Sequence, residues 1–396
     1  MRILHVVPTY WPAVRYGGPI RSVHALARGL AERGHDVEVF TTNVDGPDVS
    51  TVSLAEPVDM DGVRVTYFAS PALRRLYWSP AMGRALAARV RSFDLVHLHS
   101  IFLWPTWAAA RAARAAGVPY ILAPRGMLIP ELIRRKSRWA KTAWITLIER
   151  RNLAAAAAIH ATSDLEAQDI GRFGWTLPRV AVIPNGVDDP EAVTDAASTD
   201  VAAAIKDGGI VLSLGRIIWI KGLDRVIRAL PAVPGARFVI VGDDPEGHAA
   251  FLSREAQRLG VADRVTILPR HVEGADKEAL FAAATAFAMP SLSENFGIAA
   301  IEAMRRGVPV LVTPEVGIAD LVRQSGGGIV AVGEPDAIAS GLNRLLADRA
   351  ASREMGASGQ AYAKARYDRA SVAARMEELY GDVLSSCPKS RAAGVA

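Results

Sequence analysis

Two carboxylates stand eight positions apart in the stretch SENFGIAAIEAM, residues 293–304, and could either share one proton or bind one ligand. The spacing of apolar residues after Phe296 predicts a helix, with Glu294 in the loop before it and Glu302 inside it. Eight residues of α-helix rise about 12 Å. The paired carboxyl groups of glycosidases lie roughly 5–9.5 Å apart. The spacing therefore disfavours a hydrolytic acid–base pair and favours two contacts along one extended ligand.

A pair of cations occurs in LSLGRIIWIKGLDR, residues 212–225. A predicted strand ends at Gly215, Arg216 follows it, and Lys221 opens the next predicted helix. An arginine can bind a phosphate group through two parallel hydrogen bonds, while a lysine supplies a mobile point charge. The two cations could therefore converge on one phosphate group. The alternative is two ordinary surface charges.

The first loop of the chain, PTYWPAVRYGGP, contains the adjacent glycines Gly17 and Gly18. It is not the G-x-G-x-x-G pattern of dinucleotide-binding proteins, which disfavours a dehydrogenase. Two glycines before a helix still allow the backbone to approach an anionic ligand at the helix N-terminus. The alternative is a plain connecting loop.

Strand and helix patterns alternate along the chain and predict parallel α/β sheets. Strands are predicted at 2–7, 36–42, 63–68, 93–100, 119–124 and 157–163, and again at 209–216, 236–243, 265–270, 286–291 and 309–314. We expect an N-terminal Rossmann-like domain at 1–188, a linker at 189–205, a second such domain at 206–368 and a final helix at 369–386 that packs back on the first domain. Two such domains bind ligands at the carboxyl ends of their strands.

Composition narrows the class of protein. The chain of 396 residues has a single cysteine, Cys387, so no intrachain disulfide can form, which fits a reducing compartment. We find neither a signal peptide nor an apolar stretch long enough to cross a membrane, and expect a soluble, cytoplasmic protein. The net charge of +5 comes from residues 125–151, where eight Arg and Lys face two Glu. A charge confined to one segment argues against nucleic acid as a partner.

Four motifs in order resemble the retaining glycosyltransferase family 4, whose fold, GT-B, has two Rossmann-like domains facing a central cleft. They are the double-glycine loop, I-P-N-G-V-D at 183–188, G-R-x-x-x-x-K-G from Gly215, and P-S-x-x-E-x-F-G from Pro290, followed by E-A-M and G-x-P-V. Together the motifs span nearly the whole chain. The P-R-G-M-L variant at Pro124 resembles a branch common in bacterial surface and exopolysaccharide assembly.

The resemblance implies a role for each matching residue. Arg216 and Lys221 would neutralise the diphosphate of a nucleotide sugar, and Glu294 would meet the sugar hydroxyls while Glu302 holds the ribose. The expected donor-binding residues are Gly17, Gly18, Gly215, Arg216, Lys221, Arg270, His271, Val272, Glu294, Asn295, Phe296, Gly297, Ile298 and Glu302. The resemblance also implies that the cations replace a metal ion, so we expect no metal and no cofactor beyond the donor itself.

The chain departs from the family pattern at two loops. Many members carry a histidine after the strand at 119–124, where this sequence has Arg125 and Gly126. An arginine cannot serve as a base at neutral pH but can stabilise phosphate or developing negative charge, so Arg125 joins Arg216, Lys221 and Glu294 as a catalytic candidate. His99, at a strand end, is a second sugar- or acceptor-proximal candidate, with an ordinary structural histidine as the alternative. Asp244 stands where the family commonly has G-x-G-P.

The basic segment 131–151 has helical spacing, with Arg134 and Lys141 on one face and Trp144 on another. Such a helix could contact an anionic membrane surface, which would suit a lipid-linked acceptor and a peripheral position on the inner face of the cytoplasmic membrane. The alternative is a domain helix with a solvated basic side.

The sequence therefore predicts a metal-independent hexosyltransferase that moves a sugar from a UDP- or GDP-sugar to the hydroxyl of a glycan or lipid-linked acceptor, with retention of anomeric configuration. Two other functions remain open on the same fold. A nucleotide-sugar epimerase would convert the donor without an acceptor. A non-catalytic nucleotide-sugar-binding subunit would bind the donor but transfer nothing.

Overall fold

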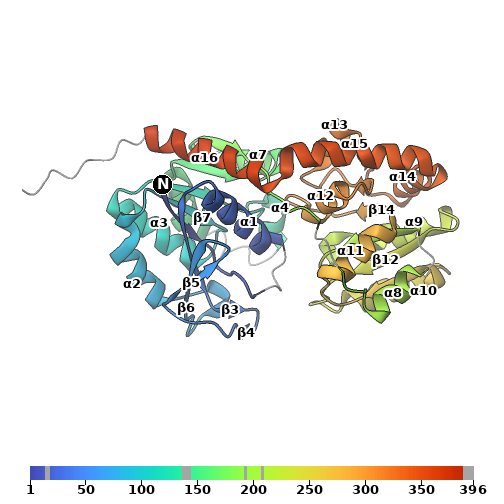
Figure 1. Cartoon of the computed structure of the whole chain (residues 1–396), viewed down its shortest axis with the longest axis horizontal. Helices are drawn as coiled ribbons and strands as arrows, with labels where there is room; N and C mark the ends of the chain where they lie inside the picture. Colours follow the sequence, from blue (N-terminus) through green and yellow to red (C-terminus); the bar gives the residue numbers. More distant parts are fainter. Residues whose placement is uncertain (14–17, 136–143, 191–193, 207–208, 387–396) are drawn as a thin grey trace, which may run out of the picture. The chain divides into compact units, whose positions relative to one another are not determined.

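The computed structural model describes residues 1–13, 18–135, 144–190, 194–206 and 209–386. The chain forms two compact units, one of Met1–Gly186 with Arg369–Ala396 and one of Val187–Asp368 (Figure 1). Each unit is a sheet of predominantly parallel strands with helices between them. The predicted α/β class and the two Rossmann-like sheets are confirmed.

The N-terminal unit has an eight-stranded sheet in the order β10-β9-β8-β7-β1-β2-β6-β5. All neighbours are parallel except the β5–β6 pair. Its strands are β1 (Arg2–Val6), β2 (Asp36–Thr42), β5 (Pro57–Met60), β6 (Val63–Phe68), β7 (Leu95–His99), β8 (Tyr120–Ala123), β9 (Ala158–Ala161) and β10 (Val180–Val182); β3 (Val44–Asp45) and β4 (Asp48–Val49) form a separate ribbon. From β1 the chain adds β2 and β6 on one side of the sheet and β7 to β10 on the other, so the switch point lies between β1 and β7. Ligands of such sheets bind at the carboxyl ends of the strands beside the switch point.

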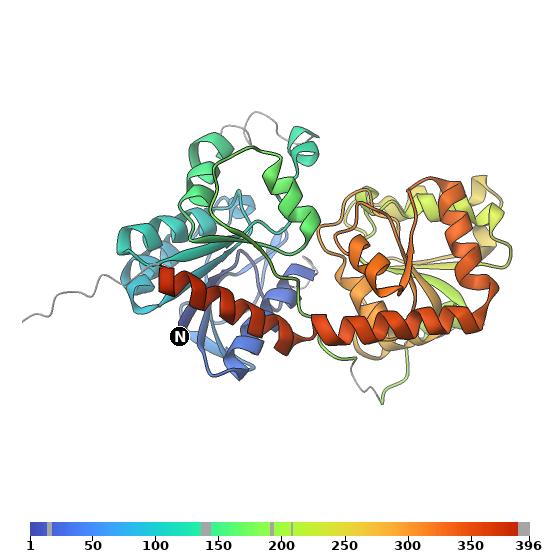
Figure 2. The same ribbon diagram turned by 90° about the horizontal axis from the view of Figure 1, so that it is seen from above.

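The helices of this unit are α1 (Gly18–Glu32), α2 (Pro80–Arg89), α3 (Trp104–Ala116), α4 (Pro130–Arg135), α6 (Arg150–Ala154), α7 (Asp164–Gly171) and α16 (Arg369–Ser386). Although α16 comes from the far end of the chain, it lies along α1, drawn red across the N-terminal unit in Figure 2. Arg369 donates to Glu32 at 3.0 Å, and Val372 and Met376 are buried in the same core as Val23 and Leu26. Apolar packing therefore joins α16 to the unit.

The C-terminal unit has six parallel strands in the order β13-β12-β11-β14-β15-β16. They are β11 (Ile210–Leu214), β12 (Arg237–Val241), β13 (Val265–Leu268), β14 (Ala284–Met289), β15 (Val310–Val312) and β16 (Gly328–Val330). The helices are α8 (Thr199–Ile205), α9 (Leu223–Ala229), α10 (His248–Arg258), α11 (Gly274–Ala283), α12 (Ile298–Arg305), α13 (Ala319–Ser325), α14 (Pro335–Ala347) and α15 (Arg349–Tyr367). Numbered within the unit the order is 3-2-1-4-5-6, and ligands of such sheets bind at the switch between strands 1 and 4.

The predicted linker is partly wrong. Residues 199–205 form helix α8, whose Val201 and Ala204 are buried in the core of the C-terminal unit. The helix could not be predicted from the sequence, because its apolar face consists of only a few small side chains and the residues before it, between Asp188 and Thr199, are mostly polar. Across the described residues, no helix combines the length and apolar character that a membrane span requires.

Candidate functional site

The loops after β11 and β14 meet at the switch point of the C-terminal sheet. The backbone N–H of Leu292 donates to the carbonyl of Ile220 at 2.8 Å. Gly222 has a φ of 61°, and a Cβ there would lie 2.3 Å from the carbonyl oxygen of Pro290. Only glycine fits both the conformation and the space. The loop that carries Lys221 is thus fixed against the loop that leads to Glu294.

Lys221 and Glu294 form an ion pair across these loops, with 21% and 20% of their side chains exposed. The backbone of Glu294 is itself held, because its N–H donates to Glu315 at 3.0 Å and its carbonyl accepts from Gly317 at 2.8 Å. The loop after β15 therefore sets the position of this carboxylate. Both charges are partly accessible, so a ligand can reach them.

Glu302 lies on α12, as predicted, while Ile301 and Met304 of the same helix face the core. Lys277 of α11 donates to Glu302 at 2.6 Å, and about a tenth of each side chain is exposed. Among the described contacts, Glu294 and Glu302 each have their own lysine and none joins the two carboxylates. The sequence analysis missed Lys277, because it lies 25 residues from Glu302 on another helix.

Arg216 follows β11 and is exposed, and within the described residues its side chain forms no ion pair. Gly215 lies between the end of β11 and Arg216. Phe296 is buried against the ring of Tyr367, with a centroid distance of 6.0 Å, while Asn295 and Ile298 are half-buried. Gly297 caps the start of α12 with a φ of 106°. The neighbouring strands β11 and β14 thus lead, respectively, to an exposed cation and to the N-terminus of α12, and both kinds of group favour an anion.

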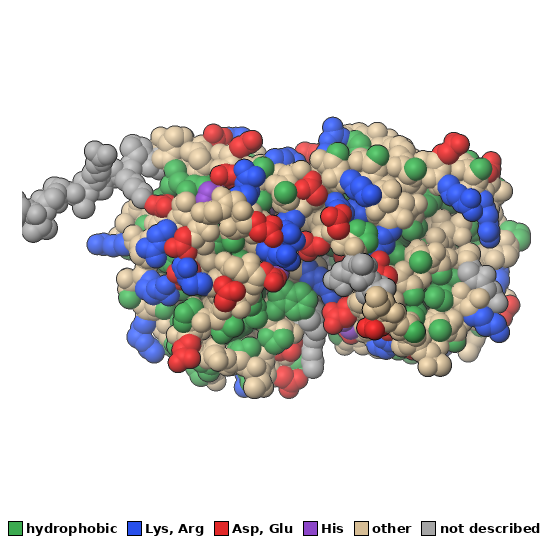
Figure 3. Space-filling model, in the orientation of Figure 1, with side chains coloured by type: hydrophobic (Ala, Val, Ile, Leu, Met, Phe, Trp, Pro, Cys, Tyr) green, Lys and Arg blue, Asp and Glu red, His purple; other side chains and the backbone are tan. Residues whose placement is uncertain are grey.

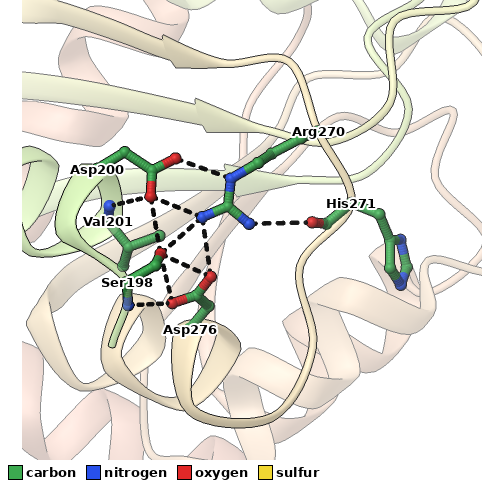
Figure 4. A network of polar contacts seen from close by, with 6 residues as sticks. All are labelled: Ser198, Asp200, Val201, Arg270, His271 and Asp276. Carbon is green, nitrogen blue, oxygen red and sulfur yellow. Dashed lines mark hydrogen bonds and ion pairs between the residues drawn. The ribbon is translucent and has the colours of Figure 1, made fainter. Parts of the chain in front are cut away.

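Three further predicted donor-binding residues, Arg270, His271 and Val272, follow β13. The Arg270 guanidinium is held by Asp200, Asp276 and Ser198 at 2.7–2.8 Å (Figure 4). These hydrogen bonds raise the pKa of Arg270 and give it a scaffolding role between α8 and α11. Val272 is buried in the core, and the half-buried His271 side chain lies 3.9 Å from Asp243. Arg270 and His271 have comparable exposure, with 38% and 35% of their side chains accessible, so a ligand can contact either, whereas Val272 is buried.

In the N-terminal unit, four histidines of β1, β7 and β9 gather on the same part of the sheet, where β8 separates β7 from β9. His5, His97, His99 and His160 are all buried. Burial, with a smaller contribution from the Arg125 charge, lowers the pKa of His5 and of His160 to about 3. Burial likewise holds the pKa of His97 and His99 well below the usual value. All four rings are therefore neutral at physiological pH.

The hydrogen bonds of the neutral rings fix their tautomers. His160 Nε2 lies 2.7 Å from the Ile183 carbonyl, which only accepts, so this nitrogen carries the proton. His160 Nδ1 then accepts from His97 Nε2 at 3.3 Å. His97 Nδ1 consequently accepts from the Tyr380 hydroxyl of α16 at 2.7 Å. The hydrogen bonds thus all donate in one direction, from Tyr380 of α16 through His97 and His160 to the Ile183 carbonyl.

A second chain of hydrogen bonds begins at Arg125, which donates to His99, and continues from His99 to His5. Because a guanidinium only donates, His99 Nδ1 accepts from Arg125 Nη2 at 3.0 Å, and His99 Nε2 donates to His5 Nδ1 at 2.9 Å. His99 is therefore an acceptor toward Arg125 and is 1% exposed, which corrects the expectation that it points toward a ligand. Its role is to orient the guanidinium.

Arg125 has a left-handed backbone, with a φ of 58°, and donates to Asn185 at 2.6 Å. Glu166 holds the next residue by accepting from the Gly126 N–H at 2.6 Å. Burial lowers the pKa of Arg125 to about 10, so the group stays charged. No described carboxylate forms an ion pair with it. Arg125 is thus a half-buried cation at the carboxyl end of β8, with the Glu166 charge nearby, and it can stabilise an anionic group in its vicinity.

Ring nitrogens of His5, His97 and His99 lie within 4.8 Å of one another, a cluster that the sequence analysis did not find. Five of their six nitrogens already take part in the hydrogen bonds above, and the remaining one, His5 Nε2, is left with the proton and no partner. The adjacent guanidinium would also repel a cation. The cluster therefore functions as a hydrogen-bonded support for Arg125.

Two predicted features fall at the limits of the described residues. Gly17 lies outside them, while Gly18 is the first residue of α1. Of the basic segment 131–151, residues 136–143 also lie outside. Its last part is anchored in the unit, because the buried Glu149 accepts from Trp144 Nε1 and the Phe102 N–H, each at 2.7 Å.

Comparison with known proteins shows which family the chain resembles. Residues 17–186 match the family model of the glycosyl transferase 4-like domain, and residues 197–362 match that of glycosyl transferases group 1. The D-inositol 3-phosphate glycosyltransferase of Salinispora tropica is 30% identical over 90% of this chain and 79% of its own. The glycogen synthase of Mycobacterium tuberculosis is 27% identical over 96% and 94%. Anabaena HepE, solved with UDP and glucose, matches with a TM-score of 0.74 and 21% identity over 96% of this chain and all of its own.

Proposed function

Since this chain belongs to the glycosyl transferases group 1 and has their GT-B fold, we propose that it transfers a sugar from a nucleotide-diphosphate donor to an acceptor hydroxyl, with retention of anomeric configuration. The observation that carries the proposal is the cluster of charges at the β11–β14 switch, where Arg216, Lys221, Glu294 and Glu302 lie on adjoining elements. UDP with glucose bound to Anabaena HepE supports a UDP-sugar as donor, with a GDP-sugar as the alternative base.

The four residues have complementary roles in this proposal. Arg216 and Lys221 neutralise the donor diphosphate, in place of a metal ion, at the N-terminus of α12. Glu294 accepts hydrogen bonds from the sugar and exchanges part of its pairing with Lys221 for them. Glu302, oriented by Lys277, accepts from the two ribose hydroxyls. Lys277 is a positioning residue, because it acts through Glu302.

Retention follows from a same-face attack in which the leaving diphosphate accepts the acceptor proton. Of the described groups, the carboxylates at the switch are paired with lysines, and the buried histidines are weak bases held by hydrogen bonds. Catalysis then consists of positioning and of stabilising the charge that develops on the diphosphate. We further propose that the acceptor is a glycan or lipid-linked intermediate of surface polysaccharide assembly, to which the P-R-G-M-L motif points.

The donor base can be identified by thermal unfolding with a panel of UDP, GDP, ADP and their sugars. A ligand at 100 times its Kd stabilises the native state by about 2.7 kcal/mol, so the matching nucleotide should raise the melting temperature by about 5 °C or more. EDTA should leave the shift unchanged. If no nucleotide in the panel shifts the wild type, the proposed donor class is wrong. Release of a new sugar from donor alone would instead favour the epimerase.

Arg125→Gln tests the cation of the N-terminal unit. We expect sugar transfer to fall about tenfold, because glutamine keeps hydrogen-bonding capacity but lacks the charge that stabilises an anionic group. The melting temperature should change little, since Arg125 is half-buried, forms no ion pair with a described carboxylate, and glutamine can still donate a hydrogen bond to Asn185. Nucleotide binding, measured by the thermal shift, should stay the same. Unchanged transfer would show that Arg125 is structural.

A further inference from the structure

Helices α2 and α3 enclose an apolar groove, the α2–α3 groove, with a cavity of about 390 Å³. Its walls are Gly83, Ala87, Val90 and Arg91 from α2 and the turn after it, and Trp104, Trp107, Ala108, Arg111, Ala112, Ala115 and Ala116 from α3. The α3 wall has residues at i, i+3, i+4, i+7 and i+8, and the other wall has them at i, i+4, i+7 and i+8, so one face of each segment forms the groove. The cavity lies within the size range of small-molecule sites, roughly 300–1,000 Å³.

The rim of the groove is strongly basic. Residues 80–92 and 104–116 contain five arginines and no aspartate or glutamate. Arg89 is paired with Glu38 at 2.6 Å, and Arg114 donates to Asn152 at 3.3 Å. The other three, Arg84, Arg91 and Arg111, are exposed and form no ion pair with any described carboxylate. Figure 3 shows Lys and Arg side chains on the surface near α2 and α3, with Asp and Glu side chains among them.

The aromatic residues place apolar and charged groups side by side. The Trp104 ring packs so closely on α2 that a Cβ at Gly83 would lie 3.3 Å from it. Arg111 lies over the Trp107 ring, 5.7 Å from its centroid. From Trp104 to Ala115 the wall rises about 16 Å, close to the half-thickness of a bilayer's hydrocarbon core, roughly 15 Å. Tryptophan beside arginine is the pairing found at membrane interfaces.

We propose that the α2–α3 groove binds an anionic phospholipid at a membrane surface, with acyl chain against its alanines and tryptophans and the phosphate on Arg91 and Arg111. Charge complementarity selects this occupant. A nucleic acid would match the arginines but would leave the apolar cavity unused, and a neutral lipid would leave the arginines unpaired. The groove is distinct from the basic segment 131–151 and does not depend on the donor site.

The test is co-sedimentation of the full chain with vesicles of equimolar phosphatidylglycerol and phosphatidylcholine in low salt. Wild type should bind these vesicles and not pure phosphatidylcholine. The double variant Arg91→Ala/Arg111→Ala should bind roughly thirtyfold more weakly. Arg254→Ala/Arg353→Ala, which removes two exposed arginines of the C-terminal unit, should change binding less than threefold. A melting temperature equal to wild type excludes misfolding.

A second measurement tests whether an acyl chain contacts the apolar wall of the α2–α3 groove. Phospholipids with brominated acyl chains should quench the tryptophan fluorescence of the wild type, and Trp104→Phe/Trp107→Phe should abolish most of the quenching. Absence of vesicle binding in low salt, equal losses in the two arginine double variants, or binding without quenching would each overturn the proposal. So would Arg91- and Arg111-dependent binding of a DNA duplex by a chain that ignores the vesicles.

Discussion

Lys221→Ala is expected to lower the rate of sugar transfer by more than tenfold. The variant removes a cation that the proposed mechanism places on the leaving diphosphate, where negative charge develops in the transition state. It also leaves Glu294 without its partner. Glu302→Ala should have an effect of the same size through loss of the ribose contact. Steady-state rates with the nucleotide sugar found by thermal shift measure both.

A double-mutant cycle tests whether Lys277 acts through Glu302. Lys277→Ala should reproduce part of the Glu302→Ala defect, and the double variant should be no worse than Glu302→Ala alone, because Lys277 acts through that carboxylate. Lys364→Ala removes an exposed lysine of the same unit and serves as the charge control. Near-normal transfer in both Lys221→Ala and Glu302→Ala would refute the site assignment.

The N-terminal unit should lose stability steeply as the pH falls from 6.5 to 4.5. The folded-state pKa of His5 and His160 is about 3, against 6.5 in the unfolded chain, so only the unfolded state binds these protons in that window. Stability therefore falls as pH falls. Each group costs up to about 2.7 kcal/mol over the two pH units, about 5 kcal/mol together. This loss is a large fraction of the free energy of unfolding of a typical domain, about 5–15 kcal/mol.

Tryptophan fluorescence during urea unfolding can follow this loss, because every tryptophan except Trp219 belongs to the N-terminal unit. The control variant His271→Gln, which changes a half-buried histidine of the C-terminal unit, should show the wild-type pH dependence. His160→Gln should reduce the dependence of the free energy of unfolding on pH, between pH 6.5 and 4.5, by the contribution of one proton. NMR of the imidazoles gives an independent readout, since the four buried rings should stay neutral down to pH 5. Titration of those rings near pH 6.5 would contradict the burial argument.

Much of the fold could be predicted because it depends on local patterns. Runs of alternating strand and helix periodicity predicted both sheets, and α12 begins where the apolar spacing after Gly297 indicated. The prediction failed at α8, where a short helix buries only small residues that resemble a linker. The partners of Arg270 were also not predicted, because nothing near it in sequence reveals that Asp200, 70 residues away, binds its guanidinium.

The sequence by itself determined the family and the identities of the charged residues, because motifs and periodicity are properties of short segments. Only the tertiary structure decided which residues meet. Lys277 finds Glu302 because α11 and α12 pack together, and Tyr380 finds His97 across 283 residues because α16 returns to the first unit. Arg125 is aimed by His99 because β7 and β8 are neighbours in the sheet. Strand order and helix packing set these contacts, and neither is written in any one segment of the chain.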